Sequence, residues 1–154
     1  MDTVENRLER LEITLPAAAA PVANYVPVLQ AGSMLYVSGQ LPLVDGKLLL
    51  TGKLGDEVST HAGVAAARAC FINILAQLQN YLDNDWSRVK QVVRLGGFIA
   101  STPDFTEQAT VMNGASDLAA AVFAPHGQHT RSTVGVASLP LNAPVEVEAL
   151  FEIR

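Results

Sequence analysis

Arg131 and Glu146 are the residues of this sequence whose types and positions most favour a role in chemistry. A guanidinium group presents its N–H groups as a planar fork, so Arg131 can bind a carboxylate through two parallel hydrogen bonds. The alternative for Arg131 is a surface or interface salt bridge. A carboxylate such as Glu146 can orient a water molecule. The alternative for Glu146 is a position on a solvated strand face, because it shares that face with Glu148 and Glu152.

Signatures of other catalytic and metal-binding families do not occur in the sequence. There is no Gly-rich phosphate loop, no Cys-x-x-Cys and no His-Glu-x-x-His. His61, His126 and His129 include one close pair without a neighbouring carboxylate, so no metal site is expected. Cys70 lies in an apolar helical segment beside Phe71, which predicts a buried, unreactive thiol.

The composition favours a cytoplasmic protein without nucleic-acid or membrane partners. Apolar residues make up 49% of the chain and charged residues 16%, which indicates a large core or apolar surface buried between subunits. The net charge is −5 and the basic residues are scattered, whereas nucleic-acid binders carry a basic patch. No apolar run approaches the ~20 residues that span a bilayer. A single cysteine and the lack of an export signal make the reducing cytoplasm the expected compartment.

The hydrophobic periodicity predicts a single α+β domain over residues 1–154. Two helices of unequal length are expected to cover one face of a mostly antiparallel sheet, and a short amphipathic helix with Val4, Leu8 and Leu11 on one side precedes them. We expect strands at 25–29, 34–38, 41–44, 47–50, 88–99, 130–137 and 145–153, and long helices at 57–82 and 104–123.

Local signals set the expected boundaries of these elements. Asp56 and Glu57 suit the positive N-terminal end of the first long helix, and Asp104 suits an N-cap of the second. The pair Asp45-Gly46 accepts the positive φ angles of a type I′ turn, so a hairpin is expected there.

The last two strands are expected to pair around a turn near Pro140. In that pairing Arg131 lies opposite Leu150, and Glu146 lies about four residues further along. At ~3.3 Å per residue the two backbones would be ~13 Å apart, too far for a direct salt bridge. A small substrate and a water molecule would fit between them, unless one of the two residues faces the site of a neighbouring subunit.

The segment from His129 to Pro140, with the strand that follows, resembles the C-terminal signature of the RidA/YjgF family, also called endoribonuclease L-PSP. The shared pattern is Arg-Ser opening a strand, Leu-Pro in a turn and an alternating strand that bears a glutamate. Tyr25, Ser38-Gly39-Gln40 and Asn113 are similar to further family positions. The sequence around Asn113, together with the long first helix, looks like a divergent subgroup.

This resemblance implies a chorismate-mutase-like fold assembled as a homotrimer, with three ligand sites between subunits. It also implies hydrolysis of reactive enamines and imines, such as 2-aminoacrylate, to 2-keto acids and ammonia. In that reaction Arg131 anchors the substrate carboxylate and Glu146 positions the attacking water. Tyr25 contributes a phenol hydrogen bond and Ser38 or Gly39 offers backbone groups. No cofactor is implied, because an imine hydrolyses readily once its water is oriented.

Three further residues belong to the expected ligand site, and two of them have a structural alternative. Asn113 is similar to a family asparagine near the site, or it caps or bends a helix that contains Gly114. His129 is a site wall or proton donor, or a hydrogen-bonded histidine at the rim. Thr133 stands where some deaminase members carry a cysteine, which alters the pocket wall. Tyr25 has an alternative as well, as a half-buried strand residue.

Two other functions remain open on the sequence. The same arginine would serve a non-catalytic binder of small carboxylates or a regulatory trimer. The ribonuclease activity in the family label conflicts with the net charge of −5 and the scattered basic residues.

Overall fold

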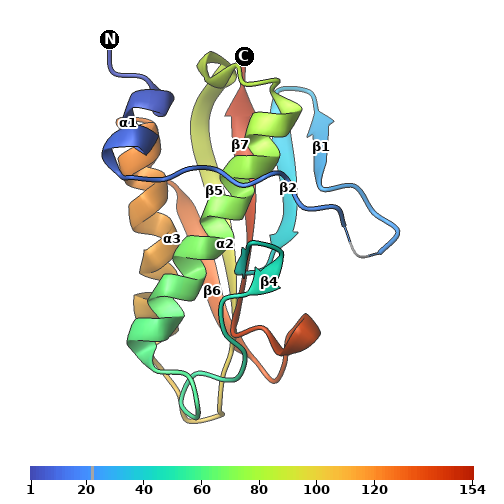
Figure 1. Ribbon diagram of the computed structural model, residues 1–154, viewed down its shortest axis with the longest axis vertical. Helices are drawn as coiled ribbons and strands as arrows, with labels where there is room; N and C mark the ends of the chain where they lie inside the picture. Colours follow the sequence, from blue (N-terminus) through green and yellow to red (C-terminus); the bar gives the residue numbers. More distant parts are fainter. Residues whose placement is uncertain (22) are drawn as a thin grey trace.

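The computed structural model describes residues 1–21 and 23–154, which form a five-stranded sheet with two long helices on one face (Figure 1). The expected α+β class and the covered face are confirmed. In chain order the elements are α1 Val4–Arg10, β1 Val28–Ala31, β2 Met34–Gln40, β3 Leu43–Val44, β4 Lys47–Leu48, α2 Thr60–Tyr81, β5 Val89–Ala100, α3 Gln108–Phe123, β6 Thr130–Val136 and β7 Val145–Ile153.

The strand order in the sheet is β1-β2-β7-β5-β6, and β5 and β6 are parallel while the other pairs are antiparallel. The predicted hairpin between the last two strands is therefore wrong. Arg131 pairs with Leu95 on β5, and Leu95 in turn pairs with Ala149 on β7. Since α3 connects β5 to β6, β6 returns in the same direction as β5.

The predicted alternation of β7 is confirmed and sets the two faces of the sheet. Val145, Val147 and Phe151 are fully buried against the helices, while Glu146 and Glu148 between them point to the opposite face. That opposite face, which we call the open face, has Leu29, Tyr36 and Val134 among its exposed apolar residues. The strand register assigns these residues to the open face, because paired residues lie on the same face of a sheet. Leu29 pairs with Tyr36, and Tyr36 pairs with Leu150 of β7. Val134 pairs with Phe98, and Phe98 pairs with Glu146 of β7.

Helix α2 supplies most of the helical part of the core. It begins at Thr60 rather than at Glu57, because the Ser59 side chain caps it by accepting a hydrogen bond from the Ala62 amide at 3.1 Å. By length and composition this 22-residue helix could cross a membrane, but 67% of its apolar window is buried inside the protein. Packing on the sheet and on α3 accounts for its apolar character.

Two other predicted boundaries are also wrong. Helix α3 begins at Gln108, so Asp104 is not its N-cap and lies in the turn before it. Strand β1 begins at Val28, so Tyr25 precedes the sheet and lies in a bend. The hairpin at Asp45-Gly46 is confirmed, with φ of 53° and 78° at these residues, although its strands are only two residues long.

The predicted N-terminal helix is present as α1 and lies beside the C-terminal part of α3 (Figure 1). Its Leu8 is buried in the core, and Arg7 donates a hydrogen bond to the Val122 carbonyl at 2.9 Å. Asp2 accepts hydrogen bonds from Arg7 and Arg10, which hold the pKa of its carboxyl well below the usual range.

Candidate functional site

The sheet separates the predicted site residues into two groups. Arg131 points toward α3 on the helix-covered side, whereas Glu146 lies on the open face. Their backbones are two strands and three residues apart in the sheet, roughly 14 Å from strand spacing and rise. Within one chain these two side chains cannot bind the same small molecule.

Helix α3 holds the guanidinium of Arg131 at the edge of the sheet. Nη1 donates to Asn113 Oδ1 at 2.8 Å and to Ser116 Oγ at 3.0 Å, and Nη2 donates to the Ala109 carbonyl at 3.1 Å. Asn113 thus contacts Arg131 directly. Three of the five N–H groups have partners among the described residues, which leaves one on Nε and one on Nη2 for a two-bond contact with a carboxylate.

Ser116 links Arg131 to His129 and was not predicted as a site residue. His129 Nδ1 lies 2.7 Å from the Gly127 carbonyl, which can only accept, so Nδ1 carries the proton when the ring is neutral. Nε2 then accepts from the Ser116 hydroxyl at 2.9 Å, while Ser116 Oγ accepts from Arg131. The spacing of Asn113 and Ser116, three residues apart on one helical face, is the sequence signal that could have found this contact.

Thr133 lies on the same side of β6 as Arg131, two residues further along the strand. Its hydroxyl oxygen is buried and has no hydrogen-bond partner within residues 1–21 and 23–154. Buried polar atoms normally have partners, so this hydroxyl is an exception among the described residues, and its predicted contact with a ligand stays a prediction.

Glu146 lies against Gly39 on the open face. A Cβ atom built on Gly39 would lie 2.8 Å from Glu146 Cδ and 3.1 Å from Cγ, so only glycine leaves room for this carboxylate position. Partial burial, together with the nearby Glu148 carboxylate, raises the pKa of Glu146. Glu148 itself pairs with Arg94 at 3.2 Å.

Ser38 precedes Gly39 on β2, and Tyr25 lies in the segment before β1. The Ser38 hydroxyl donates to the Val26 carbonyl at 2.8 Å, and its amide donates to the Pro27 carbonyl at 2.9 Å. Ser38 therefore fixes the segment that carries Tyr25. Its predicted contact with a ligand stays a prediction. Tyr25 is 47% exposed and lies before β1, so it is not the strand residue of the alternative interpretation.

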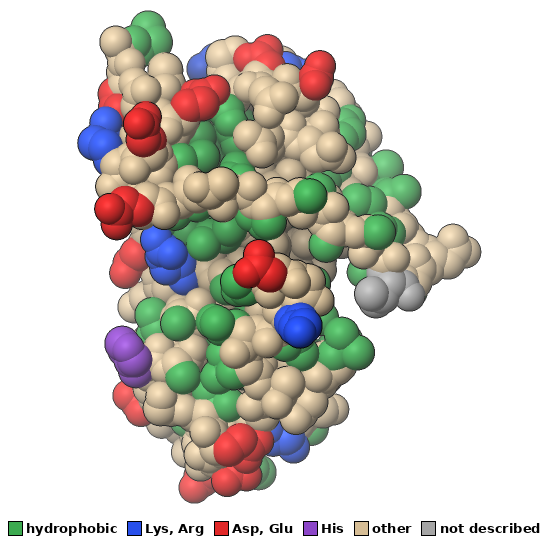
Figure 2. Space-filling model, in the orientation of Figure 1, with side chains coloured by type: hydrophobic (Ala, Val, Ile, Leu, Met, Phe, Trp, Pro, Cys, Tyr) green, Lys and Arg blue, Asp and Glu red, His purple; other side chains and the backbone are tan. Residues whose placement is uncertain are grey.

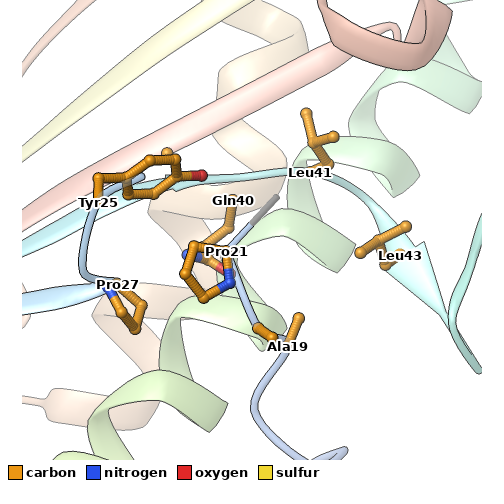
Figure 3. Close-up of a pocket in the computed structure, with 9 residues that line it drawn as sticks. Ala19, Pro21, Tyr25, Pro27, Gln40, Leu41 and Leu43 are labelled. Atoms are coloured by element: carbon orange, nitrogen blue, oxygen red, sulfur yellow. The ribbon is translucent and has the colours of Figure 1, made fainter. Parts of the chain in front are cut away.

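A small cavity of about 50 Å³ lies between Tyr25, Gly39 and the chain segment before β1. Figure 3 shows the Tyr25 ring at one end of this cavity and Leu41 and Leu43 at the other. Pro21 lies between them in that view. Among the described residues that line it, the polar side-chain groups are the Tyr25 hydroxyl and the Gln40 amide.

The two groups provide complementary chemistry on different surfaces. The group at Arg131 offers charged N–H donors to an anion. The group at Glu146 offers a carboxylate that can accept and return a proton. Cys70 belongs to neither group, because its thiol is fully buried, lies 3.5 Å from the Val145 carbonyl, and has its pKa raised by burial.

Comparison with known proteins identifies relatives over almost the whole chain. Residues 5–153 match the model of the YjgF/chorismate mutase-like endoribonuclease family. Protein TCP17 of Trypanosoma cruzi is 51% identical over 98% of this chain and 94% of its own. A protein of Dermatophagoides farinae named 2-iminobutanoate/2-iminopropanoate deaminase is 31% identical over 92% of this chain and 95% of its own. The crystal structure of Atu1372 from Agrobacterium tumefaciens has a TM-score of 0.93 at 48% identity, covering 99% of this chain and 94% of that one.

Proposed function

Because this chain belongs to the YjgF/chorismate mutase-like endoribonuclease family, we propose that it hydrolyses small 2-imino acids to 2-keto acids and ammonia. The relative from Dermatophagoides farinae bears the name of this activity. The observation that carries the proposal is the pair of half-sites: an arginine with two N–H groups open to a carboxylate, and a half-buried glutamate of raised pKa against Gly39.

The proposed site forms between two copies of the chain, within a homotrimer. Arg131 and Glu146 lie on opposite sides of the sheet in one chain, so a shared substrate needs one residue from each of two subunits. The open face beside Glu146 exposes Leu29, Tyr36 and Val134, and burying such apolar side chains favours association. The edge of β6 and α3 that carries Arg131 would then lie over the neighbouring open face.

In the proposed reaction Arg131 binds the substrate carboxylate, and Glu146 positions a water molecule on the imine carbon. The water oxygen forms the C–O bond while Glu146 takes a water proton, and the imine nitrogen becomes an amine as it gains a proton. The hydroxyl proton then passes to the amine nitrogen, the C–N bond breaks, and ammonia leaves with the keto acid as the other product. A raised pKa suits Glu146 to this exchange, because a base works best with a pKa near the working pH.

The test is the rate of 2-keto acid formation from a freshly generated 2-imino acid. We expect the wild-type chain to accelerate it and Arg131→Ala to remove the acceleration, since the variant cannot hold the carboxylate. Arg131→Lys keeps the charge without the fork and serves as the matched control, with an intermediate rate expected. Equal rates for the wild type and Arg131→Ala would reject this catalytic site.

A non-catalytic carboxylate binder is the other outcome of the same experiment. It would appear as tight 2-keto acid binding that depends on Arg131, without a deaminase rate on any 2-imino acid. Ribonuclease activity is not proposed, because Lys and Arg side chains are scattered over the face in Figure 2 and the net charge is −5.

A further inference from the structure

Ser116 and His129 form a hydroxyl–imidazole pair that the proposed imine hydrolysis does not use. Ser116 Oγ lies 2.9 Å from His129 Nε2, and His129 Nδ1 lies 2.7 Å from the Gly127 carbonyl. Because that carbonyl binds the Nδ1 proton, the neutral ring turns an unprotonated Nε2 toward the serine hydroxyl. A nucleophile, a base within hydrogen-bond reach and a third group that orients the base are the parts of an activated serine.

Strand β5 fixes the turn that precedes His129. Gln91 Nε2 donates to the His126 carbonyl at 2.9 Å and to the Gln128 carbonyl at 2.7 Å. The Val92 amide also donates to the His126 carbonyl, at 2.9 Å. These bonds connect the turn to the sheet at two successive positions, so the backbone that carries the imidazole has a defined place.

Helix α3 fixes the same turn from the other side. Gly127 is buried, and a Cβ atom built on it would overlap the Ala119 carbonyl oxygen, so only glycine lets the turn approach the helix this closely. The close approach brings the Gly127 carbonyl to His129 and the imidazole to Ser116 on the same helix. A base held in advance by its surroundings needs little reorganisation when it takes a proton.

Arg131 and Asn113 place hydrogen-bond donors around the serine hydroxyl. Arg131 Nη1 donates to Ser116 Oγ at 3.0 Å, so the guanidinium stabilises negative charge that grows on Oγ as its proton leaves. The same Nη1 donates to Asn113 Oδ1, so the Asn113 amide and the Ser116 hydroxyl are neighbours around this nitrogen. Within residues 1–21 and 23–154 the Asn113 Nδ2 group has no acceptor, which leaves it for the carbonyl oxygen of a substrate.

We propose that Ser116 is a nucleophile activated by His129, and that this chain cleaves small esters as a second activity. Both side chains are partly exposed, so a small acyl group can reach the hydroxyl. The proposal does not rest on imine hydrolysis. Arg131 offers Nε and Nη2 to a carboxylate, whereas the nitrogen that contacts Ser116 is Nη1.

Ester cleavage at this pair takes two steps. In the first, Ser116 Oγ forms a bond to the carbonyl carbon while its proton passes to His129 Nε2. The C–O bond to the alcohol then breaks, and the alcohol oxygen takes that proton from Nε2. In the second step His129 takes a proton from water as the water oxygen attacks the acyl carbon. The bond to Oγ breaks, Oγ regains that proton, and the free acid leaves.

The test on the intact wild-type chain uses p-nitrophenyl acetate, an acid quench and peptide mass spectrometry that locates the acetyl group. Ser132 is the internal reference, because it is exposed and lies one residue beyond Arg131. We expect Ser116 to be acetylated at least about 100-fold faster than Ser132, as general-base catalysis provides. In the chain unfolded by urea the two serines should react at equal rates.

Two histidine variants identify the base. His129→Gln keeps an acceptor near the hydroxyl but cannot take up its proton, so acetylation of Ser116 should slow by about 100-fold. His126→Gln is the matched control, since this exposed residue contributes its backbone carbonyl to the turn, and it should keep the wild-type rate. Circular dichroism verifies the fold of both variants. If His129→Gln loses its fold, the comparison of Ser116 with Ser132 in the wild type decides.

The outcomes separate this activity from the proposed imine hydrolysis. Acetylation of Ser116 that is fast in the wild type and slow in His129→Gln supports the nucleophile, whether or not the chain hydrolyses an imine. Acetylation confined to amino groups, an equal rate at Ser116 and Ser132 in the folded chain, or an unchanged rate in a folded His129→Gln overturns it.

Discussion

Replacing Gly39 with alanine tests whether Glu146 must lie where the structure places it. The added Cβ would lie 2.8 Å from Glu146 Cδ and 3.1 Å from Cγ. Favourable carbon–carbon contacts begin near 3.5 Å, so the carboxylate has to move by about 1 Å. Glu146 is a flexible, half-buried side chain on the open face, so we expect the free energy of unfolding to change by less than about 1 kcal/mol.

The activity should fall much more than the stability. A displacement of about 1 Å in a catalytic group costs on the order of 10²-fold in rate, which is ~2.7 kcal/mol in the activation barrier. The assay follows 2-oxobutanoate formation from freshly generated 2-iminobutanoate, with thermal unfolding of the variant and the wild type measured in parallel.

A double-mutant cycle with Glu146→Gln identifies the cause of the loss. If Gly39 acts only by leaving room for the carboxylate, alanine at this position adds no loss to a chain that already carries Glu146→Gln. A Gly39→Ala protein with the wild-type rate, or losses that multiply in the double variant, would refute this reasoning.

Three further predictions concern the network at the arginine, the glutamate and the open face. Ser116→Ala removes one acceptor of Arg131 and the partner of His129, and kcat/KM should fall about tenfold, as expected for one hydrogen bond to a charged group. Burial raises the pKa of Glu146, so ionisation of this carboxyl opposes folding at pH values above the usual carboxyl range. Glu146→Gln should therefore raise the Tm at pH 7. An equal gain in Tm below about pH 4 would contradict this reasoning. Tyr36→Glu places a charge on the open face, where Tyr36 is 50% exposed, and sedimentation should show a smaller species with lost activity and unchanged circular dichroism.

Local patterns predicted the elements well because their signals lie within a few residues. The alternation of Val145 and Glu146 along the last strand identified both faces of β7, and Asp45-Gly46 identified a turn. The helix starts were misplaced because several polar residues near each start can act as caps. Only the backbone around Ser59 determines which of them does so at α2.

Strand neighbours could not be read in the same way, because alternation assigns a residue to a face and not to a partner strand. The sequence places Arg131 and Glu146 on consecutive strands, and proximity in the chain favoured a hairpin. Long-range packing decided otherwise: α3 carries the chain from β5 to β6, and β7 inserts between β2 and β5.

For the candidate site, too, the residue types come from the sequence and the contacts between them come from the tertiary structure. By itself the sequence determined which residues are candidates for the chemistry, since a guanidinium, a carboxylate and the Ser-Gly-Gln segment are properties of residue type and order. Only the tertiary structure decided that Arg131 and Glu146 lie on opposite faces, that Ser116 joins Arg131 to His129, and that Gly39 makes room for Glu146. Each of these depends on contacts between residues distant in the chain, which become defined once the helices pack on the sheet.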